Sequence, residues 1–357
     1  MTLARLEIDE FRCIERAELR FDPHYNLFVG PNASGKTSLL EAIFFLGRGR
    51  SFRTNRSDTL VRAETRQFTL TGRIDTSGVS QPIGMRVNSE GIEARFAGHP
   101  VSGLAELATR LPVQAIDPEV HRLVDGGPQE RRRYLDWGVF HVEPTFVDHW
   151  RRYQRALRQR NAALKAGQAP QLVRAWDPEL LEAAEVVASH RSRYLDRLQV
   201  AVGSVGQRLL GLQIELGLTR GWSAERTLRE ALEASFARDR ERGLTHAGPH
   251  RADILVRVDG HPARDRVSRG QQKLVAAAML LGQLKCDAEQ GSGVAALLVD
   301  DPAAELDAKS LDGLLSEVLT LPSQLFITAL DPANPALQRL PHGPRFHVEH
   351  GNLARLI

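Results

Sequence analysis

The sequence predicts an α/β protein that is interrupted by a long, mainly helical segment. Strand patterns lie towards both ends of the chain, as in YNLFVG at residues 25–30 and LLVDD at residues 297–301, whereas residues 118–245 carry the apolar spacing of helices. A chain of 357 residues with 42% hydrophobic content can bury the cores of two domains. We therefore expect residues 1–117 and 246–357 to form one discontinuous α/β part and residues 118–245 to form a helical arm.

Composition and charge narrow the class of protein. The net charge is only +3, so any surface for nucleic acid must be a local basic patch. Cys13 and Cys286 lie far apart and form no metal or disulfide pattern, which favours a reducing cytosol. No leader pattern is present, and no apolar stretch approaches the roughly 20 residues that span a bilayer. We expect a cytoplasmic protein with no membrane segment.

The N-terminal part has the pattern of a mixed α/β domain. LARLEIDEF, AELRF and YNLFVG read as strands, and TSLLEAIFFLG has helical spacing that stops at Gly47. RQFTLTGRID, QPIGMRVN and GIEARFAG alternate with period 2, which predicts an antiparallel sheet beside the core. Strand patterns return near the C-terminus in ADILVRVDG, QLFITAL and FHVEHGNLARL.

A phosphate-binding loop follows the strand YNLFVG. The stretch GPNASGKT matches G-x-x-x-x-G-K-[ST], in which backbone N–H groups point at phosphate oxygens, the lysine reaches the β and γ phosphates, and the hydroxyl ligates Mg²⁺. The readable strand before and helix after make a chance match improbable. The predicted nucleotide-binding residues are Gly30, Pro31, Asn32, Ala33, Ser34, Gly35, Lys36 and Thr37.

Two aspartates follow the apolar strand in LLVDDPAAELD. We expect Asp300 to join Thr37 in the Mg²⁺ shell, as the second acidic group of such ATPases does. Asp301, next to it, is the expected base that activates water, and with Lys36 it completes the predicted catalytic pair. The alternative, a simple helix cap after a core strand, loses weight beside the phosphate-binding loop.

A second anion site is predicted at VSRGQQKL, where Ser268, Arg269, Gly270 and Gln271 precede a long alanine-rich helix. One γ-phosphate does not need two such sites from one subunit. The economical interpretation is that this loop closes over a nucleotide held by another copy, with Asp307 near the same interface. The alternative is a plain helix cap.

Three basic clusters are candidate DNA surfaces, each set against the alternative of a solvated face. The arm over residues 121–245 has 21 Lys and Arg against 16 Asp and Glu, so it is the basic part of the chain. No recognition helix is readable, which predicts binding to the DNA backbone rather than to bases. The candidates are Arg48, Arg50, Arg53 and Arg56; Arg131, Arg132 and Arg133; and Arg151, Arg152, Arg155 and Arg158.

The order GPNASGKT, SRGQ and DDPAAELD resembles that of ABC-type ATPase heads, whose signature loop acts in trans. FRCIERAEL, GGPQERRRYLDWGVFH, QRNAAL, THAGPHRADI and VSRGQQKL resemble the RecF family of bacterial recombination mediators. The resemblance implies an ATP-dependent homodimer that binds duplex or gapped DNA, works with RecR, with RecO and RecA in the same pathway, and acts in gap repair, replication restart and SOS induction. It also implies that Gln114 senses Mg²⁺ and γ-phosphate.

The chain departs from the wider ABC pattern at several positions. Ala33 and Arg269 replace frequent glycines, Asp301 stands where transporter ATPases usually have glutamate, and Thr328 stands at the place of a switch histidine. These departures predict slow ATP hydrolysis that times a switch.

The main alternative is the ATPase subunit of a membrane transporter, against which Thr328 and the basic arm argue. An SMC-type head with a long coiled coil lacks sustained heptads, and a small-molecule kinase would not explain the signature-like loop.

Overall fold

The structure is a computed structural model, and it describes residues 1–291, 296–331, 333–341 and 343–356. The chain folds into two compact units, one formed by Met1–Val120 with Gly293–Ile357 and the other by His121–Ser292. The first unit is therefore built from both ends of the sequence, as expected. The expected boundary near residue 118 lies close to the observed one, whereas the expected boundary at residue 245 does not.

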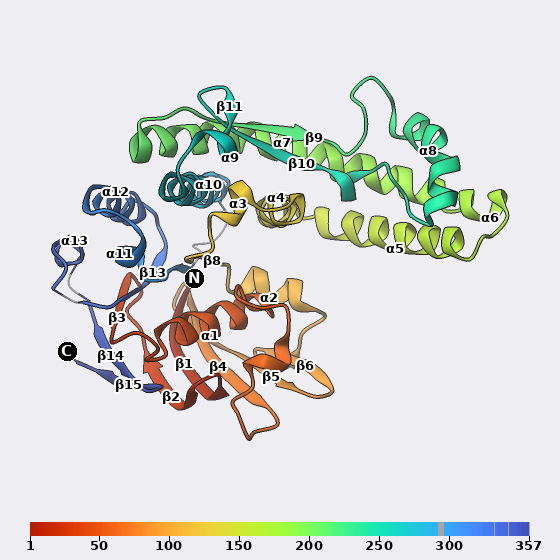
Figure 1. The fold of residues 1–357 in the computed structure, drawn as a ribbon. Helices are drawn as coiled ribbons and strands as arrows, with labels where there is room; N and C mark the ends of the chain where they lie inside the picture. Colours follow the sequence, from red (N-terminus) through yellow and green to blue (C-terminus); the bar gives the residue numbers. More distant parts are fainter. Residues whose placement is uncertain (292–295, 332, 342, 357) are drawn as a thin grey trace. The chain divides into compact units, whose positions relative to one another are not determined.

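The first unit contains an antiparallel sheet with the strand order β2-β1-β4-β5-β6-β7 (Figure 1). It confirms the sheet predicted from the period-2 segments, because β4, β5 and β6 pair in sequence order. Asn88 Oδ1 accepts hydrogen bonds from the N–H groups of Glu90 and Gly91 and so shapes the turn between β5 and β6. The strands are β1 (Thr2–Phe11), β2 (Ile14–Arg20), β4 (Phe68–Thr76), β5 (Val79–Asn88), β6 (Gly91–Phe96) and β7 (His99–Pro100).

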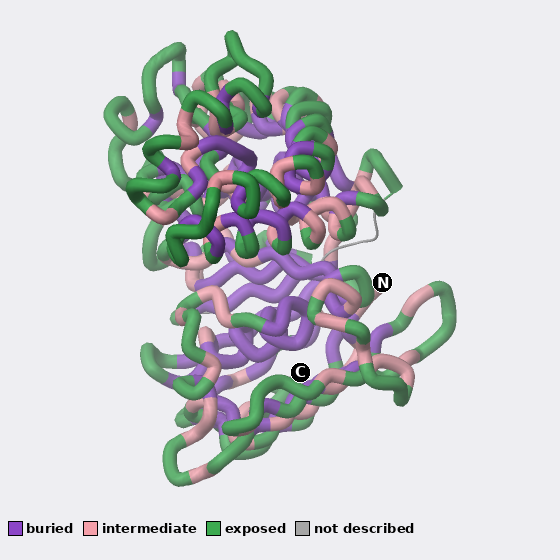
Figure 2. The backbone as a smooth tube through the Cα atoms, turned by 90° about the vertical axis from the view of Figure 1, so that its right-hand side faces the viewer, coloured by how far each residue is buried: buried purple, intermediate pink, exposed green. Residues whose placement is uncertain are grey.

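A second sheet in the same unit has the order β15-β14-β3-β13-β12-β8, with parallel pairing except between β14 and β15. Every residue of β3, β12 and β13 is buried, as expected of strands covered on both faces (Figure 2). The strands are β3 (Tyr25–Val29), β8 (Val113–Ile116), β12 (Ala296–Val299), β13 (Gln324–Ala329), β14 (Arg345–Glu349) and β15 (Asn352–Arg355).

Helix α1 (Lys36–Arg48) packs between these two sheets, in contact with β1 and β4 of the first and β8 and β13 of the second. All but one of its residues are buried, because both of its faces meet a sheet. The core around it is rich in phenylalanine, with Phe11, Phe45 and Phe68 in edge contacts. The other helices of this unit are α2 (Leu104–Arg110), α11 (Pro302–Glu305), α12 (Ala308–Leu319) and α13 (Pro335–Gln338), with a 3-10 turn at Ser57–Leu60.

The second unit is mainly helical and is organised around α7 (Asp177–Leu210), which packs against α4, α5, α10 and strand β9. The ends of this helix have the residues typical of helix termini: Pro178 lies in its first turn and Gly211 caps it with φ 66°. The other helices are α3 (Arg122–Asp125), α4 (Pro128–Val142), α5 (Phe146–Lys165), α6 (Pro170–Arg174), α8 (Leu228–Arg242), α9 (Ala263–Arg266) and α10 (Arg269–Glu289), with a 3-10 turn at Pro249–Arg251.

This unit differs from the predicted arm in two respects. It includes a three-stranded antiparallel sheet of β9 (Ile214–Thr219), β10 (Asp253–Val258) and β11 (His261–Pro262), although no strand was expected within residues 118–245. It also includes α10, which packs against α7 and so belongs with the helical part. Within the described ranges, none of the helices combines the length and apolar character that crossing a bilayer requires.

Candidate functional site

The phosphate-binding loop joins β3 to α1 with the backbone that its sequence predicts. Gly35 has φ 112° and immediately precedes the first helical residue, so the N–H groups of the helix start face the loop. Ala33 has φ 61°, a left-handed conformation that costs an L-residue about 1–2 kcal/mol relative to its usual range. This strain gives a physical reason for the glycine that related loops often carry at that position.

The turn between β14 and β15 packs against the phosphate-binding loop. The N–H of Gly351 donates to Ser34 O at 2.8 Å. A methyl group on Gly30 would lie 2.1 Å from Val348 O, and one on Gly35 would lie 3.1 Å from the sulfur of Cys13 and 3.4 Å from the Cα of Gly351. Gly30 is therefore required by close packing against the backbone of Val348, and Gly35 chiefly by its left-handed conformation.

Lys36, the lysine of the loop, folds back over it. Its Nζ donates to Gly30 O at 2.7 Å and to Pro31 O at 2.9 Å, and only 6% of the residue is exposed. Burial lowers the pKa of Lys36, while Asp301 and Asp300 oppose that shift. The ammonium group thus lies along the concave side of the loop, where the β and γ phosphates of a nucleotide are held in such loops.

Thr37 and Asp300 meet as predicted, although 263 positions separate them in the chain. Thr37 Oγ1 donates to Asp300 Oδ2 at 2.8 Å, and Thr328 Oγ1 donates to Asp300 Oδ1 at 2.7 Å. Parallel pairing of β12, β13 and β3 brings the ends of these strands, and therefore the three side chains, to one edge of the sheet. The sequence placed Thr328 only at the position of a switch histidine, and its hydrogen bond to Asp300 was not predicted.

The carboxylate of Asp301 is bound less fully than that of its neighbour, with the backbone of Ala304 as a hydrogen-bond partner. Its backbone is left-handed, with φ 42°, and its N–H donates to Thr328 Oγ1 at 2.8 Å. Within the part of the chain that the structure describes, its buried Oδ1 has no hydrogen-bond partner. Burial raises the pKa of Asp301, and Lys36 opposes the rise. A carboxylate with a raised pKa and a free oxygen is suited to accept a proton.

The structure does not bring Gln114 to this cluster, which corrects the implied metal-sensing role. Gln114 pairs with Leu297 on β12, three positions before Asp300, and is buried. Its Oε1 accepts a hydrogen bond from Arg48 Nη2 at 2.8 Å. At about 3.3 Å per residue along a strand, Gln114 lies roughly 10 Å back from the edge where Asp300 stands.

The signature stretch begins helix α10 with a capping box. Ser268 Oγ accepts from Gln271 N at 3.3 Å, and Gln271 Oε1 accepts from Ser268 N at 3.0 Å. Arg269 and Gly270 are exposed in the first turn of this 21-residue helix. Asp307 likewise caps α12, accepting from Lys309 N and Ser310 N at 3.0 Å. The stretch is a helix cap in one chain, with exposed groups that a second chain can meet.

The first cluster of predicted DNA-binding arginines, at residues 48–56, contains one buried and three exposed members. Arg48 is buried, and its Nε donates to Val113 O at 3.0 Å, so it is not a surface group and its predicted DNA contact is wrong in this conformation. Arg50, Arg53 and Arg56 are exposed, as predicted. Arg53 lies 3.5 Å from Glu41, and Arg56 forms an exposed ion pair with Asp58 at 2.6 Å.

The other two predicted clusters, at residues 131–133 and 151–158, also contain both paired and exposed arginines. Arg131 is buried and binds both oxygens of Asp253 at 2.8 and 2.9 Å, and Arg132 donates to Ala252 O at 2.7 Å, so these two have structural partners instead of free surface positions. Arg133 is half-buried beside Glu130. Arg152 binds Glu179 and Glu182. The exposed members are Arg151, Arg155 and Arg158, which form the stripe on α5 that helical spacing predicted.

The fold and this site define an ABC-type ATPase head joined to a helical unit, the class to which SMC heads belong. A solved structure of an SMC head bound to the C-terminal winged-helix domain of ScpA matches the whole chain with a TM-score of 0.61 at 15% identity, and 98% of that chain is covered. Two solved structures described as the recombination mediator protein RecF in the RecFOR pathway match far better. The one with ATP gives a TM-score of 0.90 at 25% identity, covering 100% of this chain and 98% of that one.

The sequence comparisons identify the family. The profile of the RecF/RecN/SMC N terminal domain matches residues 2–337. Proteins named DNA replication and repair protein RecF are 42% identical in Stenotrophomonas maltophilia and 40% identical in Shewanella baltica, and each comparison covers 99% of both chains. The chain therefore belongs to the RecF family. These full-length relatives do not favour the alternative of a transporter ATPase.

Proposed function

We propose that the protein is an ATP-dependent DNA-binding switch of recombinational gap repair and replication restart. The observation that carries the proposal is the cluster of Thr37, Asp300 and Thr328 beside a formed phosphate-binding loop, with a buried Asp301 oxygen that has no partner among the described residues next to it. Full-length relatives named for DNA replication and repair, and the solved RecF structure with ATP, support the biological assignment.

The donor set at the site fits Mg²⁺ and ATP. Thr37 Oγ1 and Asp300 Oδ2 lie 2.8 Å apart. Two oxygens bound to Mg²⁺ at a right angle, each at about 2.1 Å, are about 3 Å apart, so this pair already has the spacing of neighbouring ligands. Thr37 and Asp300 would hold the metal, which would supply positive charge to the phosphate oxygens of the nucleotide. The phosphate chain would lie along the N–H groups of residues 30–37, with Lys36 alongside.

Hydrolysis follows from the position of Asp301. Its carboxylate accepts a proton from a water molecule, whose oxygen forms a bond to the γ-phosphorus. The bond from that phosphorus to the β,γ-bridging oxygen breaks, which gives ADP and inorganic phosphate. Aspartate is one methylene shorter than the glutamate of transporter ATPases, so the water must lie closer to the main chain, and we expect slow turnover that times a switch.

The dimer is the second part of the proposal. The exposed N-terminus of α10, at Ser268 to Gln271, offers backbone N–H groups and the positive end of the helix dipole to the γ-phosphate bound by another copy. Asp307 caps α12 a few residues after Asp301, and we place it at the same interface. ATP then joins two heads, and its hydrolysis separates them.

DNA binding is assigned to the arginines that the structure leaves exposed. These are Arg50, Arg53 and Arg56 in one unit and Arg151, Arg155 and Arg158 in the other, with Arg133 as a half-buried addition. Their exposed guanidinium groups suit the phosphates of duplex or gapped DNA, which would compete with the carboxylates that Arg53, Arg56, Arg133 and Arg151 contact in this structure. Family membership extends the proposal to RecR as partner, with RecO and RecA in the pathway, to SOS induction, and to the cytoplasm as compartment.

The test compares wild type, Lys36→Ala and Ser268→Ala by sedimentation, with and without ATP and Mg²⁺, in the presence of a fluorescent gapped duplex. We expect only wild type to dimerise with ATP and to bind the duplex more tightly in the dimer. Dimerisation of Ser268→Ala as in wild type would show that the α10 terminus is only a cap. Nucleotide binding is measured separately, so failure of the dimer does not refute the ATP site.

A further inference from the structure

The 3-10 turn Pro249–Arg251 is held in place by side chains from two helices of the mainly helical unit. Arg191, on α7, donates from Nη1 to Pro249 O at 2.7 Å. The hydroxyl of Tyr153, on α5, forms a hydrogen bond with Nδ1 of His250, and Tyr153 is fully buried. These contacts fix the backbone of the turn and therefore the point from which the side chain of Arg251 extends.

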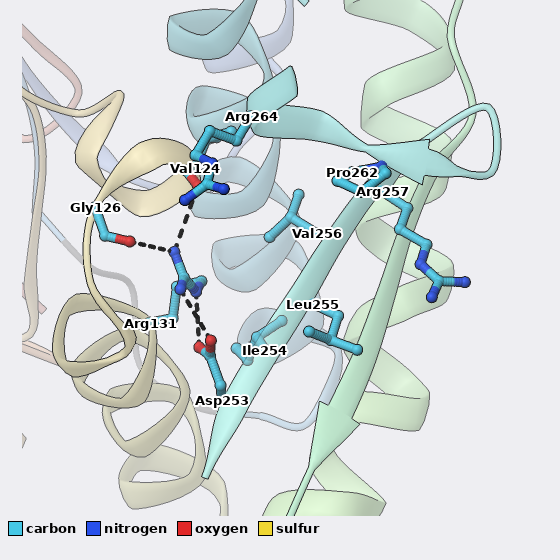
Figure 3. Close-up of a pocket in the computed structure, with 10 residues that line it drawn as sticks. All are labelled: Val124, Gly126, Arg131, Asp253, Ile254, Leu255, Val256, Arg257, Pro262 and Arg264. Carbon is cyan, nitrogen blue, oxygen red and sulfur yellow. Dashed lines mark hydrogen bonds and ion pairs between the residues drawn. The ribbon is translucent and has the colours of Figure 1, made fainter. Parts of the chain in front are cut away.

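Two aspartates near Arg132, Asp136 and Asp253, are each bound by another arginine. Arg191 binds both oxygens of Asp136, at 2.7 and 2.9 Å. Arg131 binds both oxygens of Asp253, at 2.8 and 2.9 Å, as the dashed lines in Figure 3 show. Arg132 lies four residues before Asp136 on α4, the usual spacing of a helical ion pair, yet no carboxylate of the described chain pairs with it.

Arg132 and Arg251 meet at this turn, and neither has an acidic partner. Arg132 donates from Nη1 to Ala252 O at 2.7 Å, which holds its guanidinium group beside the residue that follows Arg251. Arg251 is exposed, and within the part of the chain that the structure describes its side chain forms no ion pair or hydrogen bond. Burial lowers the pKa of Arg132, and the positive charges of Arg191 and Arg251 lower it further, while the two aspartates oppose the shift. The two unpaired guanidinium groups are thus close enough to repel each other.

The turn therefore carries an excess of positive charge. His250 adds nothing to it at neutral pH, because burial lowers its pKa to about 4 and both of its ring nitrogens have hydrogen-bond partners. A bound anion would offset the repulsion between the unpaired cations and accept charge-assisted hydrogen bonds from them. Four arginines face two aspartates, which leaves a local charge of +2: Arg131, Arg132, Arg191 and Arg251 against Asp136 and Asp253.

A further cation adjoins the turn. The backbone of Gly221 packs against it, since a methyl group on Gly221 would lie 2.2 Å from Gly248 O and 3.0 Å from the carbonyl carbon of Arg251. Arg220, the residue before, is exposed, and its guanidinium group lies over the ring of Trp222 at 5.3 Å from the centroid. Neighbouring cations on a rigid backbone suit successive phosphates of a nucleic-acid strand better than a single carboxylate.

We propose that Arg132 and Arg251 together bind a phosphate group of the DNA backbone, with Arg220 as the neighbouring cation along the strand. Arginine suits this role because its planar fork of N–H donors matches the oxygens of a phosphate. The site rests on the DNA binding proposed above, but it is formed within one unit and uses neither ATP nor a second copy. It should therefore supply affinity for DNA that remains when no nucleotide is bound.

The first experiment measures fluorescence anisotropy of a labelled gapped duplex with the full-length protein, without nucleotide and across a salt series. For Arg251→Ala we expect the slope of log K against log salt to fall in magnitude by about 0.9, which corresponds to an affinity about eightfold weaker at about 0.1 M salt. The matched control is Arg257→Ala, which removes an exposed arginine of the adjoining strand β10 that likewise forms no ion pair among the described residues. It should bind like wild type, and an equal loss in both variants would overturn the proposal.

The second experiment separates the guanidinium fork from charge alone. Arg132→Lys keeps the charge and can still donate to Ala252 O, but it lacks the planar fork. We expect a several-fold weaker affinity for the duplex with an unchanged salt slope, and an unfolding free energy in urea close to that of wild type. Wild-type affinity in Arg132→Lys would show that Arg132 makes no specific contact with the phosphate, against the proposal.

A third measurement tests the site when DNA binding itself is in question. Inorganic phosphate replaces DNA, and Lys36→Ala is compared with the double variant Lys36→Ala with Arg251→Ala, so that the phosphate-binding loop contributes little. Potassium phosphate should raise the melting temperature of the first protein more than that of the second, relative to potassium chloride of equal ionic strength. If wild type binds no duplex, the proposed DNA function fails, while this difference would still support the phosphate site. Equal stabilisation of both proteins would refute the site itself.

Discussion

Asp300 and Asp301 are neighbours in the chain with opposite surroundings. Both oxygens of Asp300 accept hydroxyl hydrogen bonds, from Thr37 and from Thr328, whereas Asp301 keeps a buried oxygen without a partner among the described residues. The left-handed backbone of Asp301 turns the second carboxylate away from the first. One carboxylate is therefore fixed in position, as the proposed metal ligand must be, whereas the other keeps an oxygen that can accept a proton in the proposed hydrolysis.

Thr328 is the residue on which this arrangement depends. Thr328→Val keeps the shape but removes a hydroxyl that donates to Asp300 and accepts from Asp301 N, so a buried N–H loses its partner. We expect the free energy of unfolding to fall by about 1–3 kcal/mol, and ATP turnover to fall more than ATP binding does. Urea unfolding and steady-state ATPase assays measure the two effects. Thr328→Ser retains the hydroxyl and should recover most of both; if it does not, the methyl packing matters more.

Asp287, on the buried side of α10, should make the free energy of unfolding fall as the pH rises. Burial raises its pKa from 3.8 to about 7, while its Oδ1 accepts from Tyr194 at 2.7 Å. Because the folded pKa exceeds the unfolded one, the contribution to stability is full below pH 3.8 and is lost as pH rises through about 7. Asp287→Asn has no such loss. Its free energy of unfolding should therefore rise relative to that of wild type by up to about 1.4 kcal/mol per pH unit between these two pKa values.

Urea unfolding of both proteins at pH 4, 5.5, 7 and 8, about a unit or more apart, measures this difference. The comparison at the lowest pH gives the cost of the substitution itself. A difference in unfolding free energy that stays constant with pH would mean that Asp287 titrates normally in the folded protein.

At the scale of elements, the hairpin of β14 and β15 is part of the nucleotide site without touching the expected position of the nucleotide. Gly351, in its turn, has φ 79° and donates to Ser34 O, and a methyl group there would lie 2.2 Å from Cys13 O. The loop's position is therefore linked to β1, β2 and the C-terminal hairpin together.

We expect Gly351→Ala to weaken ATP binding by moving this turn against the loop. The matched control is Gly98→Ala, which has a similar φ of 85° but no atom within 4 Å of the added methyl group. Both variants should lose about 1 kcal/mol or more from the left-handed backbone, and only Gly351→Ala should lose affinity in a fluorescent ATP-analogue titration. Equal ATP affinity in the two variants would show that the turn does not position the loop.

The elements that could be predicted are those with strong local signals. The phosphate-binding loop was found by its motif, and the helices α1 and α7 by their apolar period; the predicted stop of α1 at Gly47 was wrong, because the helix continues to Arg48 and Gly49 caps it. Strand β9 was missed, although Ile214, Leu216 and Leu218 alternate with other residues. It has only six residues and follows a 34-residue helix, so its alternating pattern is too short to stand out from the helical pattern before it. Its partner β10 begins 34 positions after β9 ends, beyond any local pattern.

The arginine clusters show a limit of a different kind. Arg131 in the run ERRRY reads as a surface charge, yet it binds Asp253, 122 positions later. Arg48 follows the apolar helix FFLG and binds Gln114 across the fold. The sequence shows where cations gather, but the choice between a buried ion pair and a free surface depends on acceptors that only the folded chain brings near.

At the scale of the whole molecule, one of the two boundaries between the units lies where the sequence predicted it, near residue 118. The other lies near residue 292 and not at residue 245 as expected. Helix α10 was assigned to the α/β part because it precedes the strand ending in Asp300. Its packing against α7, with Gly282 closely against Val202, places it in the helical unit. Helical spacing reports that a helix has a buried face, but not which element covers it.

If DNA binds as proposed, the exposed stripe of Arg151, Arg155 and Arg158 on α5 contributes to the salt dependence of that binding. The double variant Arg155→Ala with Arg158→Ala removes two cations, so the slope of log K against log salt should fall in magnitude by about 1.8, at about 0.9 for each phosphate that is no longer neutralised. Arg152→Ala is the control, since Arg152 already binds Glu179 and Glu182. Filter binding of a gapped duplex across a salt series measures the slope, and an unchanged slope in the double variant would place the DNA elsewhere.

The discontinuous first unit also determines when it can fold during synthesis. Strand β3, which leads into the phosphate-binding loop, lies between β13 and β14, and β8 pairs with β12. The partners of β3 are translated some 300 residues after it, a delay of about 15–60 s at roughly 5–20 residues per second. Until then the edges of β3 are open on the ribosome, so the nascent N-terminal half is a natural client for chaperones. A nascent chain stopped after the helical unit should therefore be sensitive to protease around β3.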